Sequence, residues 1–119
     1  MKVRIILSPE FNRKFRRLAK KYKSLPADYL TLSKELKEDP FRGISLGGGV
    51  RKIRMAIGSK GKGRSGGTRV LTLNVLVSDD ADVTLLTIYD KDEIDNVSDN
   101  YIKWLVSEAK TEGCHADTL

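Results

Sequence analysis

Residues 46–73 read LGGGVRKIRMAIGSKGKGRSGGTRVLTL, and their pattern predicts two strands joined by a glycine-rich loop. In the first strand, from Val50, apolar side chains alternate with mostly basic ones, which is typical of a half-buried strand. The inner face carries Ile53, Met55 and Ile57, and the outer face carries Lys52, Arg54 and Ala56. The second strand, from Arg69 to Val77, is apolar on both faces, which predicts a central position in the sheet.

The same stretch concentrates positive charge. Between positions 51 and 69 there are many basic residues and glycines but no acidic residue. The formal net charge of +6 hides a strong asymmetry, because residues 1–70 hold 19 basic against 5 acidic residues, and residues 71–119 hold 3 against 11. A concentrated positive field of this kind is typical of proteins that bind phosphate groups.

The glycine-rich loop, residues 58–67, lacks the spacing of a nucleotide-binding P-loop and joins two strands rather than a strand and a helix. Its basic side chains can instead all point at one nucleic-acid backbone, although a merely polar hairpin loop is the simpler alternative. The candidate RNA-binding residues are Arg51, Lys60, Lys62 and Arg64.

Two amphipathic helices are predicted before this region. A short strand at residues 2–7 is followed by Ser8 as a helix cap and by Pro9 in the first turn. Apolar residues then recur with the helical period, and a second such series begins near Pro26. The two stripes are Phe11, Phe15, Leu18 and Tyr22, and Leu25, Tyr29, Leu32 and Leu36.

The remaining pattern completes a small α+β domain. An Asp-rich turn at residues 78–82 precedes a third strand at 83–89, and Ser98 is a candidate cap for a final helix. The expected order is β-α-α-β-β-β-α, with a helical hairpin packed on one face of a small, mostly antiparallel twisted sheet and cations on an open second face. The acidic residues before the last helix are expected to form a solvated surface, and they are Asp90, Asp92, Glu93 and Asp95.

Length and composition indicate one domain, expected over residues 1–110, with a loosely ordered tail at 111–119. No apolar run approaches the roughly 18 residues of a membrane span, and the N-terminus is too polar for a signal peptide. The single cysteine, Cys114, favours a reducing, cytoplasmic environment. Cys114 and His115 alone make an incomplete metal site, so neither a metal nor another cofactor is expected.

The string at residues 46–73, followed by LLTIYDKDE at 85–93, resembles the RelE/HigB branch of the bacterial RelE/ParE toxin superfamily. The resemblance covers nearly the whole chain from about Lys2, and its specific part is residues 46–93. It implies a RelE-like fold, a cognate antitoxin and cleavage of mRNA on the ribosome. In the implied chemistry the ribose 2′-OH attacks the adjacent phosphate, and no metal takes part. The resulting cleavage of mRNA inhibits translation.

The resemblance also implies roles for single residues. Lys52 and Arg54 match the basic first strand of the family's site, and Arg69 matches the arginine that starts the next strand. Lys91 matches a basic residue of the family's strand-end turn. Tyr89 ends the third strand, where it can move a proton or stack on a base, or can simply face the core.

Two positions depart from the family pattern. Asp92 stands where the family has an arginine, and Ser98 lies near the position of a tyrosine that some members carry. Either Tyr89, Lys60 and Lys62 take over these tasks, or nuclease activity is weak or absent. The alternative is therefore a non-catalytic toxin or binding protein of the same fold, such as a ParE-type inhibitor of DNA gyrase.

Overall fold

The first helix begins where the sequence predicts it. The computed structural model describes residues 1–60 and 67–112, and in it strand β1 (Val3–Leu7) leads into helix α1 (Pro9–Lys21). The Ser8 hydroxyl accepts a hydrogen bond from the Phe11 amide at 3.1 Å, which satisfies one of the free donors of the first turn. A short turn then leads to α2 (Leu25–Glu38), so the predicted helical hairpin is confirmed.

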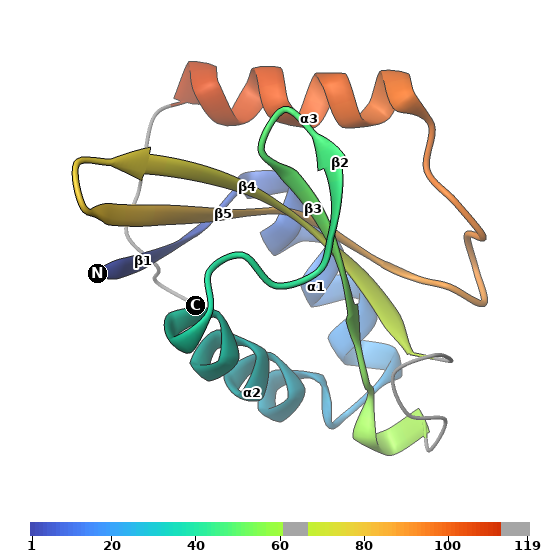
Figure 1. The fold of residues 1–119 in the computed structure, drawn as a ribbon. Coiled ribbons are helices and arrows are strands. Elements are labelled where there is room, and N and C mark those ends of the chain that lie inside the picture. Colours follow the sequence, from blue (N-terminus) through green and yellow to red (C-terminus); the bar gives the residue numbers. More distant parts are fainter. Residues whose placement is uncertain (61–66, 113–119) are drawn as a thin grey trace.

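Five strands form one mixed sheet, which Figure 1 shows beside the helices. Its order is β1-β5-β4-β3-β2, with β1 parallel to β5 and every other pair antiparallel. The basic strand is β3 (Val50–Met55), and the two long strands are β4 (Thr68–Val77) and β5 (Asp80–Asp90). Strand β4 is therefore central, as its apolar faces predict, and a short 3₁₀ turn, η1 (Gly58–Lys60), follows β3.

One strand was not predicted. Strand β2 (Ile44–Gly47) pairs with β3 and forms one edge of the sheet, with all four residues exposed. Gly47, Gly48 and Gly49 have φ angles of 91°, 63° and 85°, a conformation that suits glycine and closes the tight turn into β3. A four-residue exposed strand carries no hydrophobic alternation, so its sequence offers little signal.

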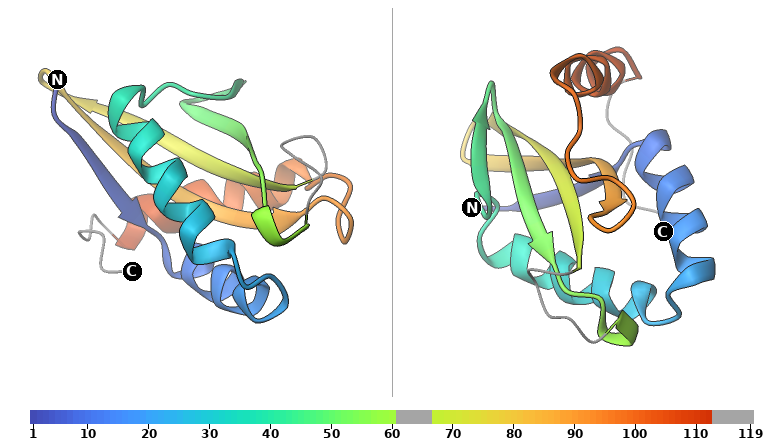
Figure 2. Two further views of the ribbon diagram at one scale, coloured as in Figure 1. Left: turned by 90° about the horizontal axis from the view of Figure 1, so that it is seen from below. Right: turned by 90° about the vertical axis from the view of Figure 1, so that its right-hand side faces the viewer.

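The two faces of the sheet have different covers. Helices α1 and α2 pack on one face, where Ile53 and Met55 join Phe11, Leu18 and Leu32 in a buried cluster. Helix α3 (Asp99–Glu112) lies across the other face, as both views in Figure 2 show. The expectation that this second face is open is therefore wrong, because the apolar side of α3 packs on part of it.

Helix α3 is capped as predicted, since the Ser98 hydroxyl accepts a hydrogen bond from the Tyr101 amide at 3.1 Å. The helix includes residues 111 and 112, which the sequence pattern assigns to the tail. The predicted RNA-binding residues Lys62 and Arg64, together with Cys114 and His115, lie outside the described residues. Within the described residues, no helix is long and apolar enough to cross a membrane.

Candidate nucleic-acid interface

The strand register brings three of the predicted site residues into one row across the sheet. Arg54 of β3 stands opposite Arg69 of β4, and Arg69 stands opposite Tyr89 of β5. Lys52 lies two positions before Arg54 and therefore points to the same face. This face is the one that α3 partly covers, because Tyr89 packs in the same cluster as Leu105 of α3.

The two arginines form a cross-strand pair of like charge. Residues directly opposite each other in an antiparallel pair have Cβ atoms roughly 4.5–5.5 Å apart, and like charges at such positions repel each other. Guanidinium groups form strong, often bidentate hydrogen bonds with phosphate. The pair therefore places two phosphate-binding side chains side by side on the sheet.

Arg69 is the buried member of the pair, with 4% of its surface exposed, whereas Arg54 is exposed. The Nη1 of Arg69 donates a hydrogen bond to the Thr68 carbonyl at 3.3 Å. The sequence left open whether a bulge turns this side chain away from the side of Leu71. The pairing of β4 with β5 shifts register only further along, between Leu71 and Thr72, and the extra residue there is Leu86 of β5, so Arg69 keeps the alternation of its strand.

Tyr89 is buried beside this arginine, with 4% of its surface exposed. Burial raises the pKa of its hydroxyl, the Arg69 charge opposes that effect, and Asp95 adds to it. The side chain therefore keeps its proton at neutral pH. In this state the Tyr89 hydroxyl can donate a hydrogen bond or a proton, but it cannot act as a base.

The other predicted cations are placed differently. Lys91 directly follows β5 on an exposed turn, and its amide donates to the Gly67 carbonyl at 3.5 Å. That contact holds the turn against the start of β4, next to the row. Arg51 alternates to the opposite face from Lys52, where its guanidinium lies 5.8 Å from the centre of the Phe41 ring. Lys60 ends the 3₁₀ turn η1, and its side chain is not described.

Gly67 shows why glycine is required at the base of the loop. A Cβ atom built on Gly67 would lie 2.2 Å from the carbonyl oxygen of Met55. No larger residue fits there without moving the backbone of β3 or β4. The glycine thus lets the two strands approach closely just before Arg54 and Arg69 meet.

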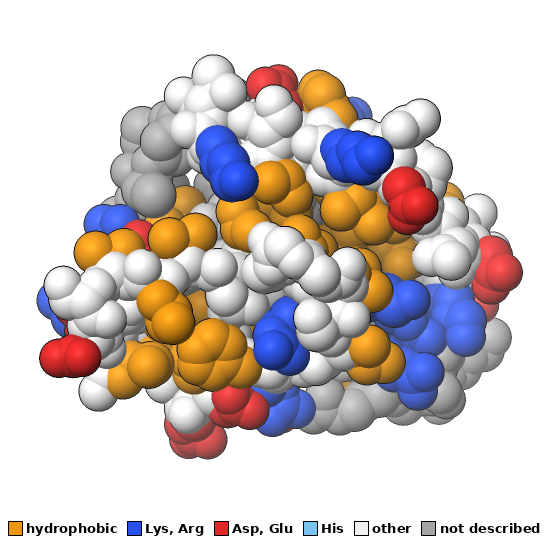
Figure 3. Space-filling view, turned by 45° about the horizontal axis from the view of Figure 1, so that its top comes forward, with side chains coloured by type: hydrophobic (Ala, Val, Ile, Leu, Met, Phe, Trp, Pro, Cys, Tyr) orange, Lys and Arg blue, Asp and Glu red, His pale blue; other side chains and the backbone are white. Residues whose placement is uncertain are grey.

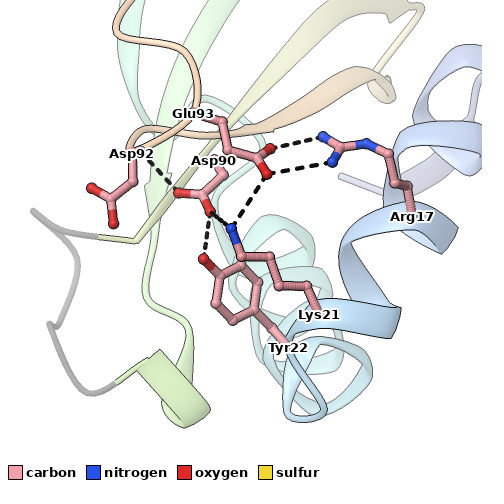
Figure 4. A network of polar contacts seen from close by, with 6 residues as sticks. All are labelled: Arg17, Lys21, Tyr22, Asp90, Asp92 and Glu93. Atoms are coloured by element: carbon pink, nitrogen blue, oxygen red, sulfur yellow. Dashed lines mark hydrogen bonds and ion pairs between the residues drawn. The ribbon is translucent and has the colours of Figure 1, made fainter.

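A polar network that the sequence analysis missed anchors the end of β5 to α1 (Figure 4). Asp90 was expected on a solvated surface, but its exposed fraction is 0%. Its carboxylate accepts hydrogen bonds from the Tyr22 hydroxyl at 2.5 Å and from the Asp92 amide at 3.0 Å, and Lys21 Nζ lies 3.7 Å away. A buried carboxylate needs such partners, and here they position the turn that carries Lys91.

Glu93 continues this network at the surface. Arg17 Nη2 donates to Glu93 Oε1 at 2.9 Å, and Lys21 Nζ donates to Glu93 Oε2 at 3.3 Å. The hydrogen bond from Arg17 is the main reason that the pKa of Glu93 is lowered, although partial burial opposes it. The end of β5 and the turn after it are therefore tied to the end of α1 through Asp90 and Glu93.

Figure 3 shows a hollow with a hydrophobic floor beneath α3, with Lys and Arg side chains around it. A cavity of about 450 Å³ lies between the β2–β3 hairpin and the start of α3. Lys52 and Lys103 line it together with the apolar side chains of Val50, Leu71 and Ile102. Within the described residues, no group of three or more His, Cys, Asp or Glu side chains is placed to hold a metal ion.

Comparison with known proteins concerns the family and the fold of the chain. Residues 8–118 match the family model described as the RelE toxin of the RelE/RelB toxin–antitoxin system. The fold is also similar to a solved structure of a mutant of the E. coli toxin RelE in the free state. That likeness has a TM-score of 0.51 at 13% sequence identity, and it covers 94% of this chain and 98% of the other, so it concerns the fold alone.

Proposed function

The chain belongs to the RelE family of toxin–antitoxin toxins, and we propose that it is a ribosome-associated endoribonuclease that cleaves mRNA without a metal ion and thereby inhibits translation. The observation that carries this proposal is the row of Arg54, Arg69 and Tyr89 across three adjacent strands. Two cations can stabilise negative charge on a phosphate, and a protonated hydroxyl can donate a proton to a leaving oxygen, so the row can support two of the tasks in phosphodiester cleavage.

In the proposed reaction the ribose 2′-OH passes its proton to a solvent water, and its oxygen forms a bond to the neighbouring phosphorus. The bond between that phosphorus and the 5′-oxygen of the next nucleotide breaks, which leaves a cyclic phosphate and a 5′-hydroxyl. Extra negative charge develops on the phosphate oxygens in the transition state. Arg54 and Arg69 stabilise this charge, because preorganised cations at such a position are effective in a site that is partly shielded from water.

The departing 5′-oxygen needs a proton, and Tyr89 is our candidate for its donor. Burial holds the pKa of Tyr89 above its ordinary value, so the phenol is protonated at neutral pH. Lys52 and Lys91 stand near the two ends of the row and would contact the phosphate or its neighbours. Arg51, Lys60, Lys62 and Arg64 remain our proposed contacts to the RNA backbone, although Arg51 points to the other face of the sheet.

Membership in the family implies a protein antitoxin as partner. We infer that the antitoxin would carry acidic residues, because an interface between opposite potentials favours association with this basic face. The cytoplasm, where ribosomes and antitoxin meet, is the proposed location.

A second candidate is a non-catalytic toxin of the same fold, such as a gyrase inhibitor. The observation that favours it is the pair of departures from the family pattern at Asp92 and Ser98. The Ser98 hydroxyl caps α3, so it serves the helix rather than a reaction. The burial of both Arg69 and Tyr89 also fits a site with limited access.

Mapping of transcript ends in bacteria after brief induction of the chain separates the two candidates. An endonuclease should create new mRNA ends within reading frames, and these should disappear in Arg54→Ala and in Arg69→Lys. The matched control is Arg16→Ala, because Arg16 is an exposed arginine of α1 outside the row. Growth arrest with intact mRNA and damaged DNA would instead identify gyrase as the target.

A further inference from the structure

A second cavity, of about 300 Å³, borders the proposed catalytic row. It opens between α1, the end of β5 and the segment that leads into α3. Its walls combine aromatic, aliphatic and polar groups, among them Lys14, Arg17, Tyr89, Ile94, Asn96 and Val97. Because Tyr89 lines the cavity, a ligand seated there lies next to the group that we assign to proton donation.

The charge around this cavity favours an anionic ligand. Lys14 and Arg17 of α1 line it, whereas no Asp or Glu does. Arg17 is already paired with Glu93. Among the described residues, Lys14 makes no hydrogen bond or ion pair, although its charge helps to lower the pKa of Glu10, so its ammonium group can contact a phosphate.

Asn96 occupies a special position because it lines both this cavity and the larger one beside Lys52. Its Oδ1 accepts a hydrogen bond from the Val97 amide at 3.1 Å, which orients the side chain. Within the described part of the chain, its amide nitrogen has no hydrogen-bond partner. A side-chain amide held in this way presents two donors, and a remaining acceptor site, to a ligand.

We propose that this cavity receives one base of a single-stranded RNA, that Asn96 hydrogen-bonds the edge of that base, and that Lys14 contacts the adjacent phosphate. Ile94 and Val97 give the cavity apolar walls, and Tyr89 gives it an aromatic one, as base recognition in single-stranded RNA requires. The inference rests on the proposed function in that RNA is taken as the ligand. It goes further by assigning a site for a base and a residue that selects which base is bound.

Binding of labelled hexaribonucleotides of A, C or U to the purified chain, measured by fluorescence polarisation, tests the site directly. We expect the chain to prefer one of the three by at least about fivefold, because a side-chain amide that hydrogen-bonds the edge of a base discriminates against bases with a different pattern of donors and acceptors. Asn96→Ala should bring the three affinities together. Lys14→Ala should weaken all three to a similar degree, because a phosphate contact carries no sequence information.

Three variants keep this test sharp. Asn96→Ser retains an oxygen for the Val97 amide but removes the amide donors, so it should lose the preference without disturbing the segment. Asn100→Ala is the matched control for Asn96, and Lys20→Ala is the control for Lys14, because neither residue lines the cavity. Equal binding of the three oligonucleotides by the unaltered chain, or a preference that survives Asn96→Ser, would overturn the proposal.

Transcript-end mapping with the same variants separates this inference from the proposed function. Cleavage whose base preference at the cut changes in Asn96→Ser supports both. Cleavage with an unchanged preference overturns the base site and leaves the endonuclease standing. Absence of cleavage, together with an Asn96-dependent binding preference, overturns the endonuclease and leaves the base site standing.

Discussion

The two faces of the sheet are built for different purposes. The face under α1 and α2 is a continuous apolar cluster in which Phe11, Leu18, Leu25 and Leu36 are almost completely buried. The face under α3 has a smaller apolar cluster, and beside it stand two opposed arginines and two cavities. The comparison teaches that stability and the candidate site lie on opposite faces of one sheet, so substitutions on each face should have separable effects.

The largest effect is expected on the helical-hairpin face. Phe11→Ala should lower the free energy of unfolding by about 3–5 kcal/mol, because it removes a large buried ring and leaves a cavity. Phe11 is 1% exposed and its ring stacks on that of Phe15, with centroids 5.7 Å apart. Urea denaturation followed by circular dichroism measures the change. A loss below about 1 kcal/mol would contradict the assignment of this face as the main core.

The next largest effect concerns the network that joins α1 to the end of β5. Tyr22→Phe removes the hydroxyl that donates to the buried Asp90, and it should cost about 1–3 kcal/mol. The contrasting variant is Arg17→Ala, which removes an exposed ion pair of the same network and should cost at most about 1 kcal/mol. Urea denaturation again measures the free energy of unfolding. An equal loss in the two variants would show that the hydrogen bond to the buried Asp90 contributes no more than the exposed ion pair.

A smaller effect should appear at high pH where α3 meets the rest of the fold. Burial, followed by the hydrogen bond to Glu10, raises the pKa of Tyr101 from 10.0 to about 12. The folded state thus disfavours the ionised phenol. The protonated Tyr101 therefore contributes stability below pH 10, and this contribution should be lost as pH rises from 10 to about 12. Tyr101→Phe should flatten this part of the pH profile of unfolding, and an unchanged slope would contradict the assignment.

The smallest change in stability is expected on the α3 face itself. Arg54→Ala should shift the free energy of unfolding by less than about 1 kcal/mol, because Arg54 is exposed and faces a like charge. The same change should abolish the new mRNA ends expected of an endonuclease. A parallel loss of stability and activity would show that Arg54 supports the fold. It would contradict the view that stability and the candidate site lie on opposite faces of the sheet.

Much of this architecture was visible in the sequence because it depends on local periodicity. The stripes of α1 and α2, the Ser8 and Ser98 caps and the central position of β4 were all predicted and are confirmed. Each follows from the spacing of apolar residues or from the chemistry of a helix end. Strand β2 was missed because it is short and exposed, and it depends on three glycines whose φ angles only the fold reveals.

The candidate site was only partly predictable. Lys52 and Arg54 were assigned to one face by alternation, which is a local property. The opposition of Arg54, Arg69 and Tyr89 depends on strand register, and no pattern within a single strand sets a register. Asn96 carried no signal, because its importance comes from cavities whose walls are supplied by α1, β5 and α3.

The sequence by itself determined the helices, most strands, the basic surface and the resemblance to the RelE/HigB toxins, because these depend on composition and on short-range periodicity. Tertiary structure alone decided that Asp90 is buried against Tyr22 and that α3 covers part of the cationic face. These two outcomes depend on contacts between segments far apart in the chain. Such contacts form only when the whole apolar surface is buried together, so a local pattern cannot encode them.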